Sequence, residues 1–346
     1  MIKIGPYEIG TGRCFIIAEA GINHNGNVET AKKMIDAARE CGADAVKFQS
    51  FKAEWLCNLD LKETKDVEAL TGGTKSSYEM YKALELSDEA HAEIFQHAKK
   101  AGLLCFSSVF DPRTVDFLVP LNIPAIKISS GDLTHYPLIE KAAKTGLPVL
   151  ISTGMATLSE VVDCYEFVSR MTSNCIFLHC VSEYPPLPND LNLRVIPSLK
   201  VTLPCPVGFS DHSKSMAAAL AAVSLGADVL EKHFTLDNQM DGPDQKLSTN
   251  PDDFTMLVKT VREIETALGT PFKQPSPAEW KGRFDGRRGI KAAKNLEAGH
   301  VLQAEDLAVI KPSSGLPPSK LSEVIGKTLL RKIQHGTPLT WNLLKE

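Results

Sequence analysis

The sequence lacks the features that would place it in a membrane or among disulfide-bonded secreted proteins. None of its apolar runs reaches the roughly 18 residues that a membrane-spanning helix needs. Its eight cysteines form no CxxC pair and have no regular spacing, which favours reduced thiols over a disulfide framework. The first residues contain no long apolar core of the kind found in secretory signals. We therefore expect a cytoplasmic protein without a membrane partner.

The distribution of charge also disfavours nucleic acid as a partner. Residues 281–346 carry 12 Lys/Arg against 6 Asp/Glu, a balance of +6, whereas residues 1–280 carry 26 against 36, a balance of −10. The basic residues are scattered among apolar ones and do not form a basic tract. This division favours attraction of the basic segment to an acidic partner domain or to an anionic substrate.

Eight short, continuously apolar runs alternate with helical patterns, which is typical of parallel strands covered by helices. The predicted strands are 15–20, 45–49, 104–110, 125–130, 148–153, 175–181, 207–212 and 229–234. Predicted helices include 28–40, 88–100, 137–144, 158–170 and 250–268. Eight such units in about 270 residues predict an α/β fold of the (β/α)8 TIM type. An open doubly wound sheet is the alternative, but no GxGxxG follows the first strand.

The chain changes character after the predicted barrel. We place the barrel at 1–272, a proline-containing linker at 273–286 and a C-terminal domain at 287–346. Short extended pieces separated by turns, with a single helical turn at 319–325, predict that this domain is small and β-rich. The polar segment 58–77 is typical of a lid or a partly disordered loop.

Polar residues end most of the predicted strands, where a barrel of this type carries its site. Two segments are the most informative, Gly208-Phe209-Ser210-Asp211-His212 and Leu230-Glu231-Lys232-His233-Phe234, because histidines at the ends of adjacent strands predict one divalent metal. The remaining rim residues are Glu19, Lys47, Gln49, Ser107, Ser108, Lys127, Ser129, Ser130, Ser152, Thr153, His179, Ser210 and Lys232. Lysines with a ring of hydroxyls suit a phosphate. The sequence therefore predicts metal-assisted chemistry on a phosphorylated small molecule.

Three polar residues keep two interpretations each. His179 has apolar neighbours and is either a hydrogen-bonded structural residue or a direct participant. His24 lies in a tight turn, where capping of the next helix also explains it. Asp211 either orients His212 or caps the helix that follows.

Together these motifs resemble those of the sialic acid synthase family, whose members make nonulosonic acids. The resemblance runs nearly from end to end. It is carried by Ile17-Ala18-Glu19-Ala20-Gly21-Ile22-Asn23-His24-Asn25-Gly26, Val46-Lys47-Phe48-Gln49, Lys127-Ile128-Ser129-Ser130-Gly131, Ile151-Ser152-Thr153-Gly154-Met155, Leu178-His179-Cys180, Tyr184-Pro185, Ser210-Asp211-His212, Glu231-Lys232-His233-Phe234-Thr235 and Gly242-Pro243-Asp244. The tail resembles the family's antifreeze-like (SAF, β-clip) domain through Leu296-Glu297-Ala298-Gly299 and Leu329-Leu330-Arg331-Lys332-Ile333.

The resemblance implies condensation of phosphoenolpyruvate with an N-acetylated mannosamine-type aldose and water, with release of phosphate. A divalent metal held by His212 and His233, Mn²⁺ or alternatively Mg²⁺ or Co²⁺, would activate the sugar aldehyde for attack by C3 of phosphoenolpyruvate. Water would add to the oxocarbenium-like C2, and the tetrahedral intermediate would expel phosphate. Glu19 would stabilise the cation or accept a proton from the water.

The resemblance also implies binding residues and a partner. Phosphoenolpyruvate would be bound by Lys47, Ser108, Lys127, Ser130, Ser152 and Ser210. The sugar would be bound by Gln49, Tyr184, Asp244 and Lys311. Family members form domain-swapped homodimers in which each antifreeze-like domain closes the partner's barrel, and the opposite charges of the two segments are consistent with this.

Three positions depart from the family's usual pattern. Ser107-Ser108-Val109-Phe110 replaces Ser-Thr-Pro-Phe, Asp132 replaces a glutamate, and Lys311 replaces an arginine that contacts the sugar's acyl group. Lysine cannot make the bidentate contact of arginine, so this change concerns the sugar more than the reaction. The run Ser182-Glu183-Tyr184-Pro185 resembles members that make legionaminic acid, which favours 2,4-diacetamido-2,4,6-trideoxymannose over N-acetylmannosamine as the acceptor.

Other functions predict different features. A pseudaminic acid synthase or another 3-deoxy-ulosonate synthase would also use phosphoenolpyruvate, but the synthases of seven- and eight-carbon acids lack the antifreeze-like tail. A Schiff-base aldolase would use Lys127 or Lys232 covalently and would leave the histidine pair unexplained. A non-catalytic carbohydrate-binding protein would have lost rim residues, and none of the core set is missing.

Overall fold

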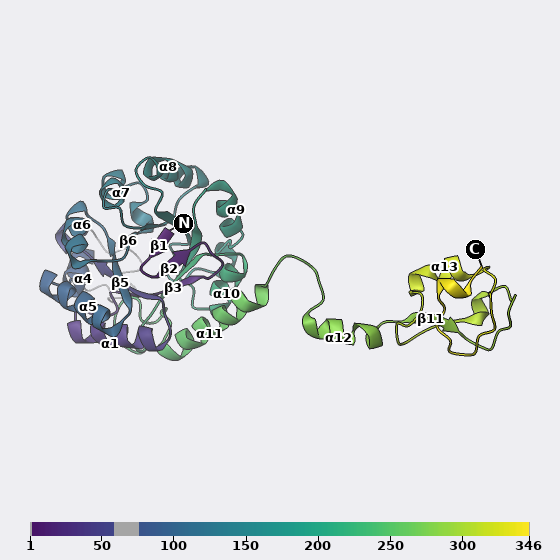
Figure 1. The fold of residues 1–346 in the computed structure, drawn as a ribbon. Helices are drawn as coiled ribbons and strands as arrows, with labels where there is room; N and C mark the ends of the chain where they lie inside the picture. Colours follow the sequence, from purple (N-terminus) through teal and green to yellow (C-terminus); the bar gives the residue numbers. More distant parts are fainter. Residues whose placement is uncertain (1, 59–75, 346) are drawn as a thin grey trace. The chain divides into compact units, whose positions relative to one another are not determined.

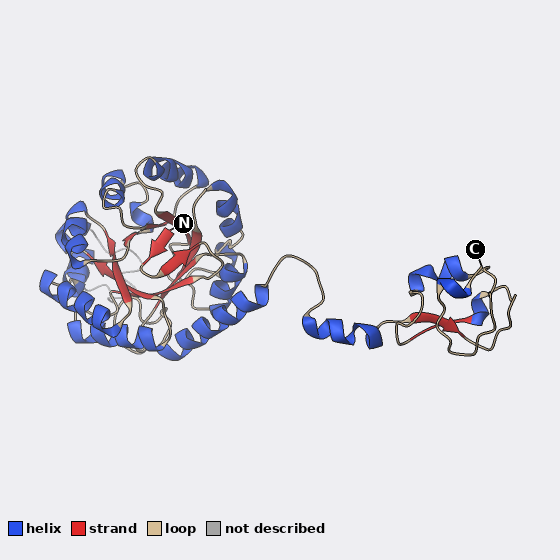
Figure 2. Cartoon of the chain, in the orientation of Figure 1, coloured by secondary structure: helices blue, strands red, loops and turns tan. Residues whose placement is uncertain are grey.

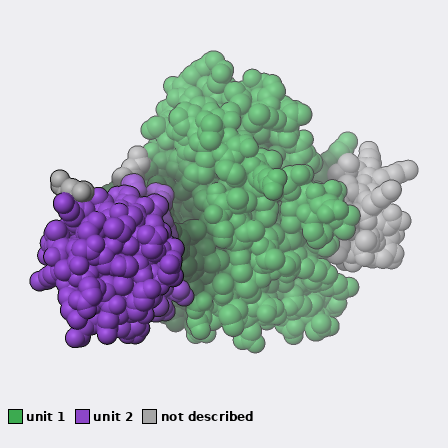
Figure 3. All heavy atoms as spheres, turned by 90° about the vertical axis from the view of Figure 1, so that its right-hand side faces the viewer, with its two compact units in different colours: residues 1–269 green, residues 270–346 purple. Residues whose placement is uncertain are grey.

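The computed structural model describes residues 2–58 and 76–345 of the chain. The predicted loop 58–77 therefore lies almost entirely outside the described residues. The chain divides into two compact units, Met1–Gly269 and Thr270–Glu346, which Figure 3 colours separately. Among the described residues, no helix is both long enough and apolar enough to cross a membrane.

The first unit is a closed barrel of eight parallel strands with helices around it, which confirms the predicted fold (Figures 1 and 2). Each strand pairs with the next along the chain, and the last pairs with the first. The strands are β3 (Phe15–Gly21), β4 (Ala45–Ser50), β5 (Leu104–Val109), β6 (Ile126–Ile128), β7 (Val149–Ser152), β8 (Cys175–Cys180), β9 (Val207–Asp211) and β10 (Val229–His233). All eight predicted runs form strands. The prediction at 125–130 was too long because β6 ends at Ile128 and Ser129 is the N-cap residue of a 3-10 turn, Ser130–Asp132.

The helices of this unit bury one face against the strands. They are α1 (Val28–Glu40), α2 (Ala53–Leu56), α4 (Ser77–Leu84), α5 (Asp88–Ala101), α6 (Pro112–Leu118), α7 (Tyr136–Ala143), α8 (Leu158–Ser169), α9 (Val195–Thr202), α10 (Met216–Ser224) and α11 (Pro251–Leu268). In α1 the buried residues recur at helical spacing, as Ala31, Met34, Ile35 and Ala38. The Asn27 side chain caps this helix by accepting a hydrogen bond from the Thr30 N–H.

A small N-terminal hairpin, which the sequence did not predict, lies at the N-terminal ends of the barrel strands. It consists of β1 (Ile2–Ile4) and β2 (Tyr7–Ile9), which pair antiparallel. Its turn residue Gly5 approaches Leu104, the first residue of β5, and Ile4 is fully buried in the barrel's core. The hairpin leaves the opposite end, where the strands finish, as the end that carries the predicted rim residues. Strands of three residues carry too little sequence pattern to be recognised.

The second unit has its own hydrophobic core, which includes Ile290, Leu302, Val324 and Leu339. A helix, α12 (Pro277–Gly286), begins after the Ser276 cap, inside the segment that the sequence assigned to a linker. Two strands, β11 (Gly289–Ala292) and β12 (Leu307–Ile310), pair antiparallel. The predicted helical turn appears as a 3-10 turn, Pro318–Lys320, followed by α13 (Leu321–Val324). Within residues 296–302 the strand pairing consists of isolated bridges, from Leu296 to Ile333 and from Val301 to Thr328.

Candidate active site

The C-terminal ends of the barrel strands bring the predicted charged residues together inside the barrel. Strand register pairs Glu19 with Lys47, and Ser108 with Lys127. All four side chains are almost completely buried. Because side chains alternate along a strand, residues two apart face the same side, which places Lys47 and Gln49 of β4 together toward the interior.

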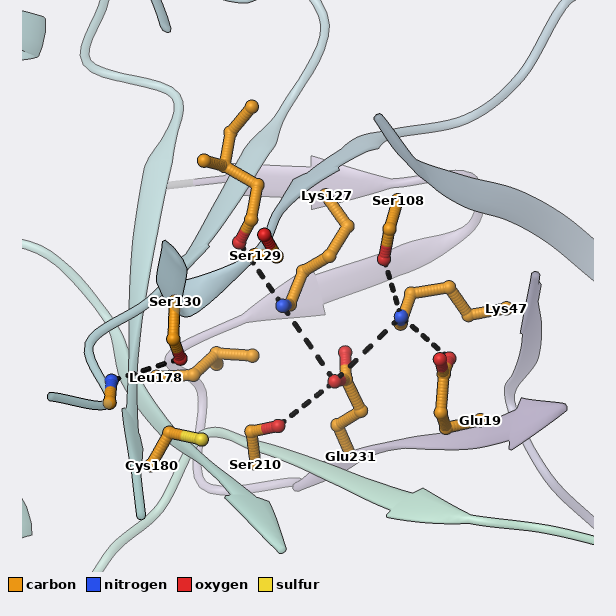
Figure 4. A network of polar contacts seen from close by, with 12 residues as sticks. Glu19, Lys47, Ser108, Lys127, Ser129, Ser130, Leu178, Cys180, Ser210 and Glu231 are labelled. Atoms are coloured by element: carbon orange, nitrogen blue, oxygen red, sulfur yellow. Dashed lines mark hydrogen bonds and ion pairs between the residues drawn. The ribbon is translucent and has the colours of Figure 1, made fainter. Parts of the chain in front are cut away.

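Lys47 lies at the centre of one group of contacts (Figure 4). Its Nζ donates to Ser108 Oγ at 2.6 Å and lies 2.6 Å from Glu19 Oε2. Gln49 Nε2 donates to the other oxygen of Glu19 at 3.3 Å. Since both oxygens of Glu19 have partners, the carboxylate is held in one orientation.

Glu231 is a site residue that the sequence analysis missed. Its Oε1 accepts a hydrogen bond from Ser210 Oγ at 2.9 Å and lies 3.7 Å from Lys127 Nζ and 3.9 Å from Lys47 Nζ (Figure 4). Its Oε2 is buried without a hydrogen-bond partner. Strand alternation could have identified it, because Glu231 stands two residues before His233 and therefore faces the same side of β10.

The two buried carboxylates, Glu19 and Glu231, have pKa values shifted in opposite directions. Burial, together with repulsion by Glu231, raises the pKa of Glu19 to about 7, although Lys47 opposes this shift. Burial alone would raise the pKa of Glu231, but Lys127 and Lys47 outweigh it and the pKa is lowered. Burial lowers the pKa of Lys127. Near neutral pH, partial protonation of Glu19 leaves positive charge in excess around Glu231, which suits an anionic ligand.

The two predicted metal ligands lie side by side at the ends of β9 and β10. The ring centroids of His212 and His233 are 5.3 Å apart, and the Tyr184 ring stacks on His212 at 4.2 Å. Nδ1 of His212 donates to the Val181 carbonyl at 2.8 Å, so Nε2 carries the lone pair in the neutral ring. The Tyr184 hydroxyl lies 3.4 Å from this Nε2. A ring held by a hydrogen bond from one nitrogen to a backbone carbonyl is typical of metal-binding histidines.

His233 offers a buried ring nitrogen without a hydrogen-bond partner, Nδ1, which lies 3.6 Å from Asp244 Oδ2. Burial and the neighbouring cations hold the pKa of His233 well below its usual range, so the ring is neutral. Burial raises the pKa of Asp244 to about 6. Within residues 2–58 and 76–345, no group of three or more His, Cys, Asp or Glu side chains is arranged as a complete metal site. The His233 ring, the neighbouring His212 ring and the Asp244 carboxylate nevertheless fit a divalent cation, because the unpartnered buried nitrogen of His233 costs free energy unless it binds something.

Three other predicted binding residues, Ser130, Ser152 and Lys311, differ in their contacts and in their place in the fold. Ser130 Oγ accepts a hydrogen bond from the Gly154 N–H at 3.0 Å. Ser152 ends β7, and its buried Oγ has no hydrogen-bond partner. Lys311 lies in the second unit, directly after β12.

Four polar residues named from the sequence make contacts away from this group. His179 Nε2 donates to the Leu191 carbonyl at 2.7 Å, which is the structural one of its two interpretations. His24 Nδ1 accepts from the Gly26 N–H at 3.0 Å, within its own turn. Asp211 accepts from the Ser213 N–H at 2.8 Å and does not contact the His212 ring. Lys232, predicted to face the rim, is paired with Asp211 at 2.7 Å between Nζ and Oδ2.

Comparison with known proteins shows the family of the chain. The NeuB family model matches residues 34–273, and the SAF domain model matches residues 287–345. The chain belongs to the NeuB family. The predicted resemblance to the sialic acid synthases is thereby confirmed, and so is the prediction of an enzyme of the nonulosonate synthase class. The SAF match also confirms the antifreeze-like domain.

Alignments with similar proteins cover nearly the whole of this NeuB-family chain. The N,N'-diacetyllegionaminic acid synthase of Legionella pneumophila is 40% identical over 333 residues, 95% of this chain and 94% of that protein. The human N-acetylneuraminate-9-phosphate synthase is 37% identical over 342 residues, 98% of this chain and 95% of that protein. A crystal structure of the N-acetylneuraminic acid synthetase of Leptospira borgpetersenii serovar Hardjo-bovis, in complex with citrate, has a TM-score of 0.73 at 33% identity and covers 81% of this chain and 94% of that one.

Proposed function

We propose that this enzyme condenses phosphoenolpyruvate with 2,4-diacetamido-2,4,6-trideoxymannose and water, yielding N,N'-diacetyllegionaminic acid and phosphate. The observation that carries the proposal is the arrangement of Glu231 between Lys47 and Lys127, beside the pair of His212 and His233. The two lysines, held near Glu231, supply positive charge for an anion, and the histidines supply a place for a divalent cation. The product named for the Legionella relative supports the choice of acceptor.

Phosphoenolpyruvate carries a phosphate and a carboxylate, and the interior of the barrel offers partners for both. Lys47 and Lys127 would provide the fixed positive charge. Hydroxyl groups would provide short donors, at Ser108, Ser130, Ser152 and Ser210. The unpartnered Ser152 Oγ is a donor that a bound phosphate oxygen would satisfy.

The aldehyde end of the sugar would lie near His212 and His233. A divalent cation held there, Mn²⁺ or alternatively Mg²⁺ or Co²⁺, would supply Lewis-acid polarisation of the aldehyde. Gln49, Tyr184 and Asp244 would bind the hydroxyl and acetamido groups of the sugar. In this arrangement C3 of phosphoenolpyruvate forms the new bond to the aldehyde carbon.

Glu19 is the proposed acceptor of a proton from the water that adds to C2. With a pKa of about 7 it exists in both protonation states at neutral pH, as a general base requires. Its carboxylate would take a proton from the water that adds to C2 and would stabilise positive charge at that carbon. Breakage of the C2–O bond to phosphate then completes the reaction, so that one water is consumed and one phosphate is released.

We further propose a homodimer in which Lys311 of one copy completes the sugar site of the other. Mixing an inactive His233→Ala protein with an inactive Lys311→Ala protein tests this. If the two copies share sites, mixed dimers contain one intact site and recover part of the activity. Recovery is absent if Lys311 serves the barrel of its own chain.

The reaction is tested by phosphate release from phosphoenolpyruvate with Mn²⁺. The assay offers 2,4-diacetamido-2,4,6-trideoxymannose and N-acetylmannosamine separately, each with and without a chelator. Release that requires the metal and is faster with the diacetamido sugar supports the proposal. Faster release with N-acetylmannosamine would assign a different acceptor to the same reaction, and no release with either sugar would contradict both.

A further inference from the structure

Lys232 and Asp211 form a buried ion pair on the side of the strands that faces away from the anion site. Lys232 Nζ lies 2.7 Å from Asp211 Oδ2, and the two side chains are 2% and 0% exposed. Strand register places the two residues directly opposite each other on β10 and β9. Neither side chain contacts Glu19, Lys47 or Glu231 in the described structure.

The pair also holds the segment that follows β9. Lys232 Nζ donates a second hydrogen bond to the Ser213 carbonyl at 2.7 Å, and Asp211 Oδ1 accepts from the Ser213 N–H at 2.8 Å. Lys232 is therefore bound to both sequence neighbours of His212, to the carboxylate of Asp211 and to the backbone carbonyl of Ser213.

The sequence neighbours of this pair are the residues that face the interior. Ser210 and His212 flank Asp211, while Glu231 and His233 flank Lys232. Ser210 donates to Glu231 across the same two strands. The ion pair between Lys232 and Asp211 thus links the ends of β9 and β10 on the face away from the anion site. Their sequence neighbours form the site on the opposite face.

We propose that Lys232 is a positioning residue, which sets the separation and orientation of the His212 and His233 rings through Asp211 and Ser213. The proposal deepens the proposed function, because it rests on these histidines as the metal ligands. It also assigns Lys232 a role other than the Schiff base that a rim lysine suggests.

A neighbouring cavity makes this role testable. A cavity of about 310 Å³ is lined by Lys232 together with Lys214, Asn238, Lys246, Asp253 and Leu257. The cavity therefore adjoins the buried Lys232 side chain. The part of that side chain beyond Cβ corresponds to propylammonium, which a Lys232→Ala variant would have room to bind beside Asp211.

The first experiment measures Mn²⁺ binding to the purified enzyme by electron paramagnetic resonance, with Lys246→Ala as the control from the same cavity. Loss of a group that orients metal ligands weakens metal affinity by about 10- to 100-fold. We expect a weakening of this size in Lys232→Ala, partial recovery with propylammonium and no recovery with propanol. The affinity for phosphoenolpyruvate should stay within about twofold, since its proposed ligands are untouched. Unchanged Mn²⁺ affinity in Lys232→Ala would overturn the proposal.

A second measurement does not depend on the metal. The ring ¹⁵N resonances of His212 and His233 in the metal-free enzyme should shift in Lys232→Ala and remain unchanged in Lys246→Ala. If wild-type enzyme binds no Mn²⁺, the metal assignment of the proposed function fails. Unchanged ring resonances in Lys232→Ala would overturn the positioning role whether or not Mn²⁺ binds.

A double variant separates positioning from stability. Replacement of a buried ion pair by apolar residues is often neutral for folding. Lys232→Met with Asp211→Leu is therefore expected to fold even if Lys232→Ala does not, while still lacking the tie to Ser213. Weak Mn²⁺ binding at unchanged melting temperature supports positioning. Normal Mn²⁺ binding in this double variant would show that the pair serves folding alone.

Discussion

Nζ of Lys47 lies 2.6 Å from Oε2 of Glu19, and both side chains are almost completely buried at the ends of two adjacent strands. The same ammonium group is 3.9 Å from Glu231. One lysine therefore carries a positive charge between two carboxylates before any substrate binds. Such an arrangement reduces the reorganisation that binding and catalysis would otherwise require.

Lys47→Met should weaken phosphoenolpyruvate binding strongly. Removal of one partner from a buried, hydrogen-bonded charge group costs about 2–5 kcal/mol, which corresponds to a KM increase of roughly 30-fold or more. Steady-state kinetics with varied phosphoenolpyruvate measure the effect. Lys259→Met, on the exposed side of α11, is the matched control and should leave KM unchanged. A normal KM in Lys47→Met would remove this lysine from the proposed anion site.

The activity should depend on the protonation of Glu19. Its pKa is about 7 because of burial and the nearby Glu231. If the ionised form is the active base, kcat/KM falls as the pH drops below about 7. Glu231→Gln removes a negative charge, so the pKa of Glu19 should fall and the acidic limb of the pH profile should move to lower pH. An acidic limb that stays in place would show that another group controls it.

His24 should make folding stability depend on pH. Burial, reinforced by repulsion from His91, lowers the pKa of His24 to about 4. The unfolded chain binds a proton at this residue below about pH 6.5. The folded protein does not bind it until about pH 4, so stability falls as the pH decreases between these values. The contribution is about 3 kcal/mol over this range.

Urea unfolding at several pH values tests this prediction. The loss of stability between pH 6.5 and 4 should be smaller in His24→Gln than in the wild type. His97→Gln, which removes a more exposed histidine, serves as the control. An identical loss in His24→Gln and wild type would mean that His24 does not contribute.

His233→Ala should abolish metal-dependent turnover while the barrel stays folded. The residue is the last of β10 and lies at the rim, outside the hydrophobic core. Phosphate release with Mn²⁺ and circular dichroism measure the two properties. Near-normal activity in this variant would contradict the metal assignment.

Much of the fold could be predicted because continuous apolar runs have few alternatives once both faces of a sheet must be buried. The two histidines were found because each ends such a run. The hairpin before β3 was missed, since three-residue strands with one polar position carry almost no pattern. Glu231 was missed for a different reason. It lies inside an apolar run. The adjacent Lys232 was predicted to face the barrel interior, although it is Glu231 that does so.

By itself the sequence determined the order of the eight strands, the presence of a second domain and the position of polar residues at the ends of most strands. These follow from local composition and spacing, which do not depend on how distant segments pack together. Only the tertiary structure decided which residues face inward and what they contact. Lys232 and Glu231 are adjacent in sequence, yet one pairs with Asp211 behind the strands and the other with Lys47 and Lys127 inside the barrel. That distinction depends on strand register and on the burial of charges from several strands. Neither can be read from a single segment of the chain.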